Sequence, residues 1–325
     1  MQFDVDVWLK VGKFAGGALA IGLGAIGAAI GEGYTASQAN AAISRNPKLS
    51  GEILKTMLVG QAVAESASIF ALVVALILLF SPSPGHSFVN VWALLSSGLC
   101  IGFGAIGSGV GAGYPAAEAC LGMSRQPSQS KKLTTNMLIG SAVCQTPAIF
   151  ALVISFILIY SETAIKPLWP NWAAVLGAGL ATGLSAIGAG YGSGLVAGAS
   201  CQGVARNPKT SSVVTNSMLL GQAIAQTTAI YGLLIGFILL FKSFPDSTNT
   251  LAPSMALLGA GICMGIGAIG PAIGEGVCAQ SAVTWIARNS EQAGVLSRTM
   301  LVGMAVAEST GIYSMVISLI LIFVI

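Results

Sequence analysis

The chain has 325 residues, of which 54% are hydrophobic and only 8% are charged, and its formal net charge is +3. Soluble domains carry roughly 25% charged residues, so this composition excludes a soluble globular domain and predicts an integral membrane protein. Its basic residues form no run long enough to suggest a nucleic-acid-binding surface.

The N-terminus reads MQFDVDVWLKVGK, in which acidic residues come before the lysines. Such a start is a poor secretory signal, and the apolar run that follows is long enough to be a retained membrane span. Six cysteines fall within or at the ends of apolar segments and form no CxxC pair. We expect them to be buried small side chains rather than metal ligands or disulfide partners.

Four segments of the chain are similar to one another: GAIGAAIGEGYTASQANAAISRNP, GAIGSGVGAGYPAAEACLGMSRQP, SAIGAGYGSGLVAGASCQGVARNP and GAIGPAIGEGVCAQSAVTWIARNS. Their shared isoleucines are 80, 81 and 82 residues apart, and so are the arginines near their ends. Self-similarity at such a period indicates a repeat architecture. We place the repeats at residues 1–84, 85–165, 166–247 and 248–325.

Each repeat holds two apolar segments, which in the first repeat run from about residue 14 to 42 and from about 53 to 80. A bilayer core needs about 20 helical residues, so each segment can span it. Backbone groups in lipid must be satisfied internally, which leaves helices or closed barrels, and runs this long predict helices. The expected fold is therefore all-α, with eight transmembrane helices in four hairpins that enter from the same side as a parallel repeat.

The first helix of each repeat is rich in glycine, whereas the second carries bulky Leu, Ile and Phe, as in IFALVVALILLF. Gly27 and Gly31 lie four residues apart, and so do Gly270 and Gly274, so each pair shares one helix face. Small residues on a shared face allow close helix packing. A thin helix paired with a thick one makes a wedge, and wedges side by side predict part of a ring with the Gly-rich helices inside and the bulky helices outside.

Two kinds of connection alternate along the chain. Short loops inside the hairpins hold the arginine motifs, which are Arg45, Asn46 and Pro47; Arg125, Gln126 and Pro127; Arg206, Asn207 and Pro208; and Arg288 and Asn289. Longer linkers, such as SPSPGHSF, join one hairpin to the next. Because basic residues gather at the short loops, the positive-inside rule places these loops in the cytoplasm and both termini and all three linkers on the other side.

Carboxylates occur in the middle of some of these apolar helices. Alignment on the arginines gives one position in the first helices and one in the second: Glu32, Ala112, Ser193 and Glu275, and Glu65, Gln145, Gln226 and Glu308. The two positions are 33 residues apart in every repeat. At about 1.5 Å per helical residue they fall at similar depth in the membrane. The two glutamates of the first repeat are therefore predicted to face each other, and so are the two of the last.

A charge at this depth costs roughly 3 kcal/mol even on the gentlest scale. Two adjacent carboxylates therefore need a proton on one of them or a cation between them. Hydroxyl and carbonyl oxygens, which a hard cation prefers, lie nearby at Ser66 and Val63, and at Ser309, Thr310 and Val306. Tyr313, five residues past Glu308, is a candidate to orient that carboxylate, although the first repeat has Phe70 there. A purely structural alternative is a protonated pair that joins two helices.

The Gly-rich helix, the Arg-Asn-Pro or Arg-Gln-Pro loop and the GQAVAES helix together resemble the c subunit, or proteolipid, of rotary ATP synthases and ATPases, over nearly the whole chain. The resemblance implies a rotor ring without cofactor, whose outer-helix carboxylates bind Na⁺ or H⁺ and meet an arginine of stator subunit a. It implies that Glu65 and Glu308 bind the ion, with Glu32 and Glu275 at the inner-helix position, and that the polar loops contact the central stalk. The last loop departs from the pattern, with Ser290 in place of proline.

Repeats two and three lack both carboxylates, and glutamine does not titrate, so these repeats should carry no proton. We expect them to be inactive, hydrogen-bonded spacers, in preference to amides that help coordinate a cation in a neighbouring repeat. The ring would consist of other copies of this chain, or of this chain with one-hairpin c subunits, surrounded by lipid.

We therefore expect a non-catalytic rotor-ring subunit of a rotary ATPase that carries Na⁺ or H⁺. The serines, Gln61 and the double carboxylate favour Na⁺, whereas Phe70 counts weakly against it. The alternative from another class is a proton- or cation-coupled secondary transporter or channel, which would predict inverted repeats or a continuous polar path. A structural membrane scaffold is a third possibility.

Overall fold

The computed structural model describes residues 4–82, 85–161, 166–244 and 251–323, and this part of the chain is helical almost throughout. Four long helices end at the loop arginines: α1 (Val5–Arg45), α3 (Phe88–Arg125), α6 (Leu168–Arg206) and α9 (Leu251–Arg288). A short 3₁₀ turn follows each of them: η1 (Pro47–Leu49), η2 (Pro127–Gln129), η4 (Pro208–Thr210) and η5 (Ser290–Gln292). The chain then returns along a second row: α2 (Ser50–Phe80), α4 (Ser130–Cys144) with α5 (Thr146–Tyr160), α7 (Ser211–Ala225) with α8 (Thr227–Phe241), and α10 (Ala293–Phe323).

Within the described residues, eight helical spans are long and apolar enough to cross a membrane. This confirms the predicted all-α fold of four hairpins, which we number 1 to 4 in chain order. The helices run longer than the apolar segments alone, because α1 begins at Val5 and ends only at Arg45. The boundaries predicted at residues 84, 165 and 247 fall among or beside residues outside the described part.

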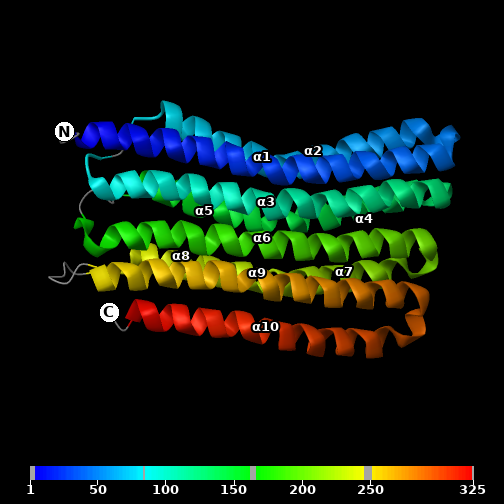
Figure 1. The fold of residues 1–325 in the computed structure, drawn as a ribbon. Helices are drawn as coiled ribbons and strands as arrows, with labels where there is room; N and C mark the ends of the chain where they lie inside the picture. The colour runs from blue at the N-terminus through cyan, green and yellow to red at the C-terminus, as the bar shows by residue number, and fades with distance from the viewer. Residues whose placement is uncertain (1–3, 83–84, 162–165, 245–250, 324–325) are drawn as a thin grey trace.

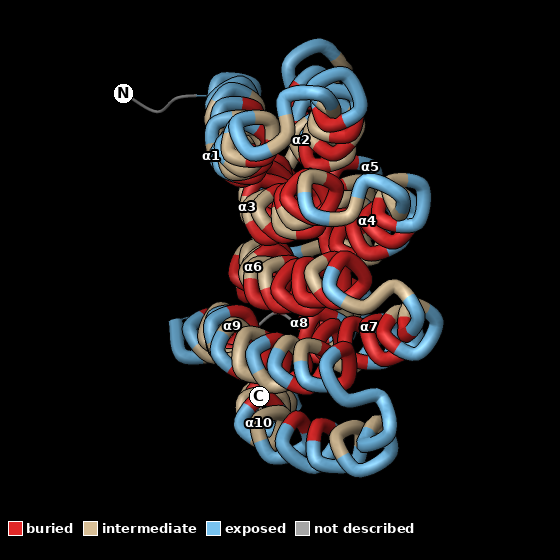
Figure 2. The backbone as a smooth tube through the Cα atoms, turned by 90° about the vertical axis from the view of Figure 1, so that its right-hand side faces the viewer, coloured by how far each residue is buried: buried red, intermediate tan, exposed pale blue. Residues whose placement is uncertain are grey.

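The hairpins form two layers (Figures 1 and 2). The Gly-rich helices α1, α3, α6 and α9 lie side by side in an inner layer, and each contacts the next. The bulkier helices form the outer layer, each beside the inner helix of its own hairpin. The four arginine loops lie at one end of the molecule, and the two ends of the chain lie at the other (Figure 1). All hairpins therefore point the same way, as a parallel repeat requires.

Glycine allows the inner helices to approach backbone to backbone. A Cβ on Gly27 would lie 2.4 Å from the carbonyl oxygen of Ile106, and one on Gly31 would lie 2.3 Å from that of Gly109. No side chain larger than hydrogen fits at such distances, so the glycines allow the backbones of α1 and α3 to come into direct contact. The predicted glycine face of α1 is therefore its contact with the next inner helix, whereas in α9 a Cβ on Gly270 meets no described atom within 4 Å and one on Gly274 meets only Ala307 of α10.

Burial falls off toward the two ends of the row of hairpins. In α6, 78% of the most apolar stretch is buried, whereas the corresponding value is 39% for α1 and 17% for the last span, Ser290–Phe323. Hairpin 1, with α1 and α2, lies at one end of the row, and hairpin 4, with α9 and α10, lies at the other (Figure 2). Each of these two hairpins therefore has a neighbouring hairpin on one side only. The chain thus has two open edges, which we call the α1 edge and the α9 edge.

The outer spans of hairpins 2 and 3 are interrupted, whereas α2 and α10 are continuous. The breaks fall at Gln145 and Gln226, the two positions where glutamine replaces glutamate. In hairpin 2 the break precedes Pro147, which has no N–H to continue the helical ladder. The six cysteines are all free and lie buried or half-buried.

Candidate ion-binding site

The contact between one hairpin and the next, which we call a seam, is where the polar side chains of the mid-membrane region meet. The chain contains three seams, 1/2, 2/3 and 3/4. At the 3/4 seam, the glutamates Glu275 and Glu308 of hairpin 4 lie against hairpin 3. We call these two residues the closed pair. The open pair, Glu32 and Glu65, belongs to hairpin 1 at the α1 edge.

The closed pair is assembled from three helices. Glu275 of α9 is 0% exposed, and neither of its carboxylate oxygens has a hydrogen-bond partner within the described chain. Glu308 of α10 is its electrostatic neighbour. The Glu308 Oε1 accepts a hydrogen bond of 2.5 Å from the hydroxyl of Tyr231, which comes from α8 in the preceding hairpin. The site is therefore two carboxylates and a phenol across one seam.

The open pair has the same two carboxylates in a different setting. Glu32 of α1 is half-buried and is an electrostatic neighbour of Glu65, which is exposed on α2. Gln61 stabilises the hairpin from within, since its Nε2 donates to the backbone carbonyl of Glu32 at 3.1 Å. At the closed pair, Tyr231 comes from the preceding hairpin. At the open pair, the corresponding place lies outside the α1 edge.

The glutamine seams are closed by direct hydrogen bonds. The Nε2 of Gln145 donates to the carbonyl of Val63 in hairpin 1 at 2.9 Å. Gln226 repeats this contact one seam later, with its Nε2 2.7 Å from the carbonyl oxygen of Val143 and 3.3 Å from the Ser193 hydroxyl. In both seams, the glutamine N–H occupies a backbone carbonyl, which is therefore not available to a cation.

Several predicted ligands are engaged elsewhere. The hydroxyls of Ser66, Ser309 and Thr310 donate to carbonyls three residues back on their own helices. The Val63 carbonyl faces the 1/2 seam and accepts from Gln145, so it lies on the side of hairpin 1 away from the α1 edge. In these hydrogen bonds the hydroxyl protons are used within their own helices, and their role as cation ligands stays a prediction.

The hydroxyl on Glu308 is that of Tyr231 and not that of Tyr313, which the sequence suggested. Tyr313 is 65% exposed in the single chain, and Val306 on the same helix is 69% exposed. Tyr231, five residues past Gln226 in hairpin 3, reaches the carboxylate of the following hairpin and not the polar residue of its own. Tyr231 was missed because its partner is 77 residues away.

The loop residues lie as a separate group at the other end of the helices. All four arginines are exposed and end the inner helices, and Arg288 stacks over the Trp285 ring at 4.5 Å. The third loop is tied to the fourth hairpin by the amide of Asn207, which donates to the Ala287 carbonyl at 3.2 Å. The four loops form a row of positive charge well away from the carboxylates.

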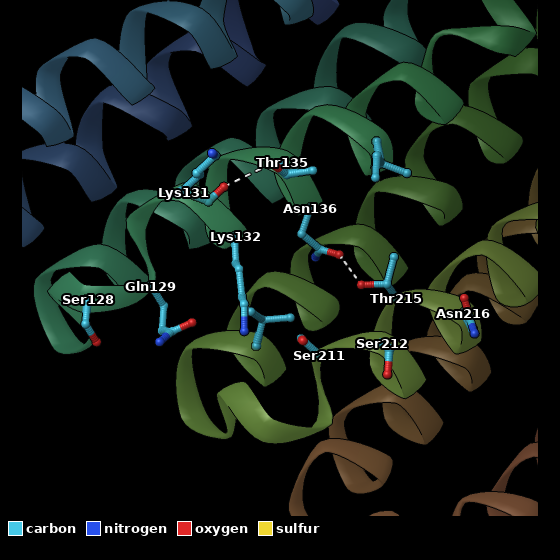
Figure 3. Close-up of a pocket in the computed structure, with 12 residues that line it drawn as sticks. Ser128, Gln129, Lys131, Lys132, Thr135, Asn136, Ser211, Ser212, Thr215 and Asn216 are labelled. Carbon is cyan, nitrogen blue, oxygen red and sulfur yellow. Dashed lines mark hydrogen bonds between the residues drawn. The ribbon is translucent and has the colours of Figure 1, made fainter.

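A cavity also lies toward the loop end, away from the carboxylates. It has a volume of about 670 Å³ between α4 and α7, and Lys131 and Lys132 stand at its rim. On its wall the Thr215 hydroxyl donates to Asn136 Oδ1 at 2.7 Å (Figure 3). The described residues hold no group of three or more His, Cys, Asp or Glu side chains that could form a metal centre.

These features define a class: a multi-pass membrane protein built of helical-hairpin repeats, with paired carboxylates in mid-span. The family model for the C subunit of ATP synthase matches residues 15–78, 95–158, 176–239 and 258–321, which is most of the chain. The chain belongs to this family, as a c subunit in which four hairpins are fused.

Curated relatives agree with this assignment. The chain is similar to the A-type ATP synthase subunit K of Methanocaldococcus jannaschii, at 31% identity over 205 residues, which cover 62% of this chain and 83% of the relative. It is also similar to the ATP synthase c subunit of Petrotoga mobilis, at 57% identity over 68 residues, or 21% of this chain and 71% of the relative. The ATP synthase c subunit of Thermotoga petrophila matches 84 residues at 46% identity, 25% of this chain and 99% of the relative. The protein is thus a membrane rotor-ring subunit of a rotary ATP synthase.

Proposed function

We propose that this protein carries a cation through the membrane on its two glutamate pairs, and that Na⁺ is preferred over H⁺. In this mechanism the cation enters through the stator, neutralises one pair, travels through lipid as the ring turns, and leaves when the pair meets an arginine of stator subunit a. The chain performs no bond chemistry, and its part is to bind, shield and release the ion.

The observation that carries the proposal is the state of Glu275. A fully buried carboxyl with both oxygens unpaired inside the described protein is costly unless something neutralises it. Its neighbour Glu308 is a second acid and cannot do so. A cation held between the two carboxylates, or a proton on one of them, removes this cost.

The donor set favours a metal cation over a proton alone. One carboxylate is enough to carry a proton, whereas Glu275 and Glu308 offer four oxygens and Tyr231 adds a phenolic oxygen at the same place. Oxygen-rich sets of this kind suit hard cations. Two carboxylates and one Na⁺ still leave one negative charge, so we propose that the loaded pair also holds one proton, on the inner glutamate, Glu32 or Glu275.

The glutamine seams do not carry ions in this proposal. The amides of Gln145 and Gln226 already donate to the carbonyls of the preceding hairpin. A donor N–H repels a cation, and the amide cannot neutralise it. Each chain then carries two ions on four hairpins. Because moving a unit charge against 100 mV costs about 2.3 kcal/mol, fewer ions per turn allow ATP hydrolysis to pump against a steeper gradient, which favours an ATP-driven pump.

The two ends of the molecule then meet different partners. We propose that the exposed arginine loops lie in the cytoplasm and contact the central stalk, because basic residues gather there. The termini and inter-hairpin linkers lie on the other side of the membrane. The exposed apolar side chains of the outer helices, such as Leu58, Leu76 and Ile320, face lipid.

Labelling with dicyclohexylcarbodiimide, which reacts with protonated carboxyls, tests this function in the assembled complex. Glu65 and Glu308 should react, the extent of reaction should fall as pH rises, and Na⁺ should protect both. Glu52, an exposed glutamate near the start of α2, serves as the control that Na⁺ leaves unchanged. Labelling without sodium protection would assign the site to H⁺. Absence of labelling at both positions would exclude the proposed ion-carrier role.

A further inference from the structure

The loop end of each seam has an opening between neighbouring outer helices. The cavity between α4 and α7 at the 2/3 seam, which we call the 2/3 cavity, has a volume of about 670 Å³. The openings between α2 and α4 and between α7 and α10 measure about 310 and 320 Å³. The 2/3 cavity is therefore the largest of these three openings.

The charges that line the three openings differ as well. At the 1/2 seam Glu52 lines the opening together with Lys55 and Lys131, so the charges there are mixed. The opening at the 3/4 seam is lined by uncharged residues. The 2/3 cavity is lined by Lys131 and Lys132 without an acidic residue, and neither lysine forms an ion pair within the described chain. This cavity therefore presents two positive charges that the described protein does not neutralise.

The lysine pair belongs to hairpin 2 alone. Alignment on the loop arginines places Lys131 and Lys132 six and seven residues after Arg125. The corresponding residues are Gly51 and Glu52 in hairpin 1, Ser212 and Val213 in hairpin 3, and Gly294 and Val295 in hairpin 4. The cationic cavity is therefore a property of hairpin 2 and not of the repeat.

The rest of the cavity wall suits a phosphate group. Both α4 and α7 begin at this end, at Ser130 and Ser211, so the positive ends of their dipoles lie at the mouth of the cavity. Hydroxyl and amide side chains line the space between the two helices (Figure 3), among them Ser128, Gln129, Ser211, Ser212 and Asn216. Such groups donate hydrogen bonds, which phosphate oxygens accept.

The 2/3 cavity crosses the boundary between lipid headgroups and hydrocarbon. Gln145 lies near the middle of the span Pro127–Tyr160, and Lys132 precedes it by 13 residues, or roughly 20 Å of helix. Because half of the hydrocarbon core is about 15 Å thick, the lysines reach the headgroup layer. Ile139, which also lines the cavity, is 6 residues or roughly 9 Å from Gln145 and lies at the depth of the acyl chains. A ligand that fills this cavity is charged at one end and apolar at the other.

We propose that the 2/3 cavity binds one anionic phospholipid, with the phosphate of its headgroup at Lys131 and Lys132 and an acyl chain along Ile139. The occupant is a phospholipid and not free phosphate, because α4 and α7 lie in the outer layer and the cavity continues to the depth of the acyl chains. The site lies between the two hairpins that lack carboxylates, so it is separate from both glutamate pairs. The lipid travels with the rotor, whichever cation the glutamates bind.

Native mass spectrometry of rotors released from the intact complex tests this site. The complex is reconstituted in nanodiscs of phosphatidylcholine with a small share of phosphatidylglycerol, and the lipids that stay bound are counted per chain. We expect one phosphatidylglycerol per chain, which inorganic phosphate does not displace. Removing two lysines beside an anionic headgroup should weaken its binding about tenfold or more, so K131M with K132M should lose this lipid.

The matched control, K48M with K209M, removes two lysines from other loops at the same end and should keep the bound lipid. T135W retains both cavity lysines but fills the space with an indole, since Thr135 is exposed on the cavity wall, and it should lose the lipid. Retention of phosphatidylglycerol by K131M with K132M, or by T135W, would overturn the proposed site. Equal retention of phosphatidylcholine, or displacement by inorganic phosphate, would overturn the assignment to an anionic phospholipid.

Discussion

The two glutamate pairs have the same residues at the same spacing and very different surroundings. Glu275 is fully buried, and its partner Glu308 accepts from a tyrosine of the preceding hairpin. Glu32 is half-buried and Glu65 is exposed, because no hairpin precedes them in the chain. The difference comes from the neighbour and not from the pair itself. In this repeat protein, a site belongs to the seam between two repeats and not to either repeat alone.

The largest expected effect comes from replacing the outer carboxylates. We expect E65Q and E308Q to lower ATP-driven ion uptake to a similar extent, and the double variant to lower it about 100-fold or more. An ion without its neutralising carboxylate costs roughly 3 kcal/mol in lipid, and each factor of ten corresponds to about 1.4 kcal/mol. Uptake into vesicles holding the whole complex measures this, with E52Q as control. If E65Q retained full uptake while E308Q lost it, the open pair would carry nothing.

The second prediction compares a glycine in a closed seam with one at an open edge. A Cβ on Gly111 would lie 2.0 Å from the carbonyl oxygen of Gly190, whereas one on Gly270 meets no described atom within 4 Å. G111A should therefore destabilise the isolated chain by about 1–3 kcal/mol through overpacking. G270A should leave the isolated chain unchanged and weaken ring assembly.

Thermal denaturation of the purified chain in detergent gives the first comparison, and the yield of intact rings gives the second. Equal loss of stability in the isolated chain for both variants would show that the α9 edge is already covered within one copy.

The third prediction concerns a seam that has no glutamate. Q226A removes the hydrogen bonds to Val143 and Ser193, and polar contacts between membrane helices contribute about 0.6 kcal/mol on average and at most about 1.7. We expect a loss of stability of about 1 kcal/mol in detergent, with the number of ions moved per ATP unchanged. Q129A, in the loop turn η2, is the control for stability. A lower ion-to-ATP ratio in Q226A would make this seam part of the carrier.

The smallest effect is expected at the C-terminal end of α10, which lies in the least buried of the eight spans. Lys242 of the preceding linker donates to the Ile322 carbonyl at 2.6 Å and stands 4.4 Å from the centre of the Phe323 ring. K242M keeps the apolar stem and removes the charge, and a cation at a helix C-terminus stabilises it by about 0.3–1 kcal/mol. Hydrogen exchange in the last turn of α10 should become a few-fold faster, and K209M in a loop should leave it unchanged.

Much of the fold could be predicted from the sequence, because each hairpin repeats the same local signals. Glycine spacing identified the inner face, the length of the apolar runs identified the spans, and the arginine motifs located the turns. The 33-residue spacing between Glu275 and Glu308 reflects two helices joined by one short turn, which is a local property. All of these features are set within a single repeat.

The neighbour of each carboxylate could not be predicted in the same way. Which hairpin a residue such as Tyr231 faces depends on the hand in which hairpins pack, and no spacing within one repeat encodes it. The signal that could have revealed it is the order Phe70, Phe150, Tyr231 and Tyr313. It becomes informative when each of these residues is compared with the glutamate or glutamine of the following repeat. Pro147 is a sequence signal for the helix break at Gln145, whereas no proline marks the break at Gln226.

The fusion of four hairpins into one chain also limits how such a rotor can vary. A ring of single hairpins can change size by one unit, whereas a ring of these chains changes only in steps of four. Its gear ratio is therefore adjusted more finely by deleting carboxylates than by adding subunits. In the proposed mechanism hairpins 2 and 3 carry no ion, so the stator would meet two loaded steps and then two idle ones, and the torque would arrive in pulses. The elasticity of the stalk would have to smooth these pulses before they reach the ATP-binding sites.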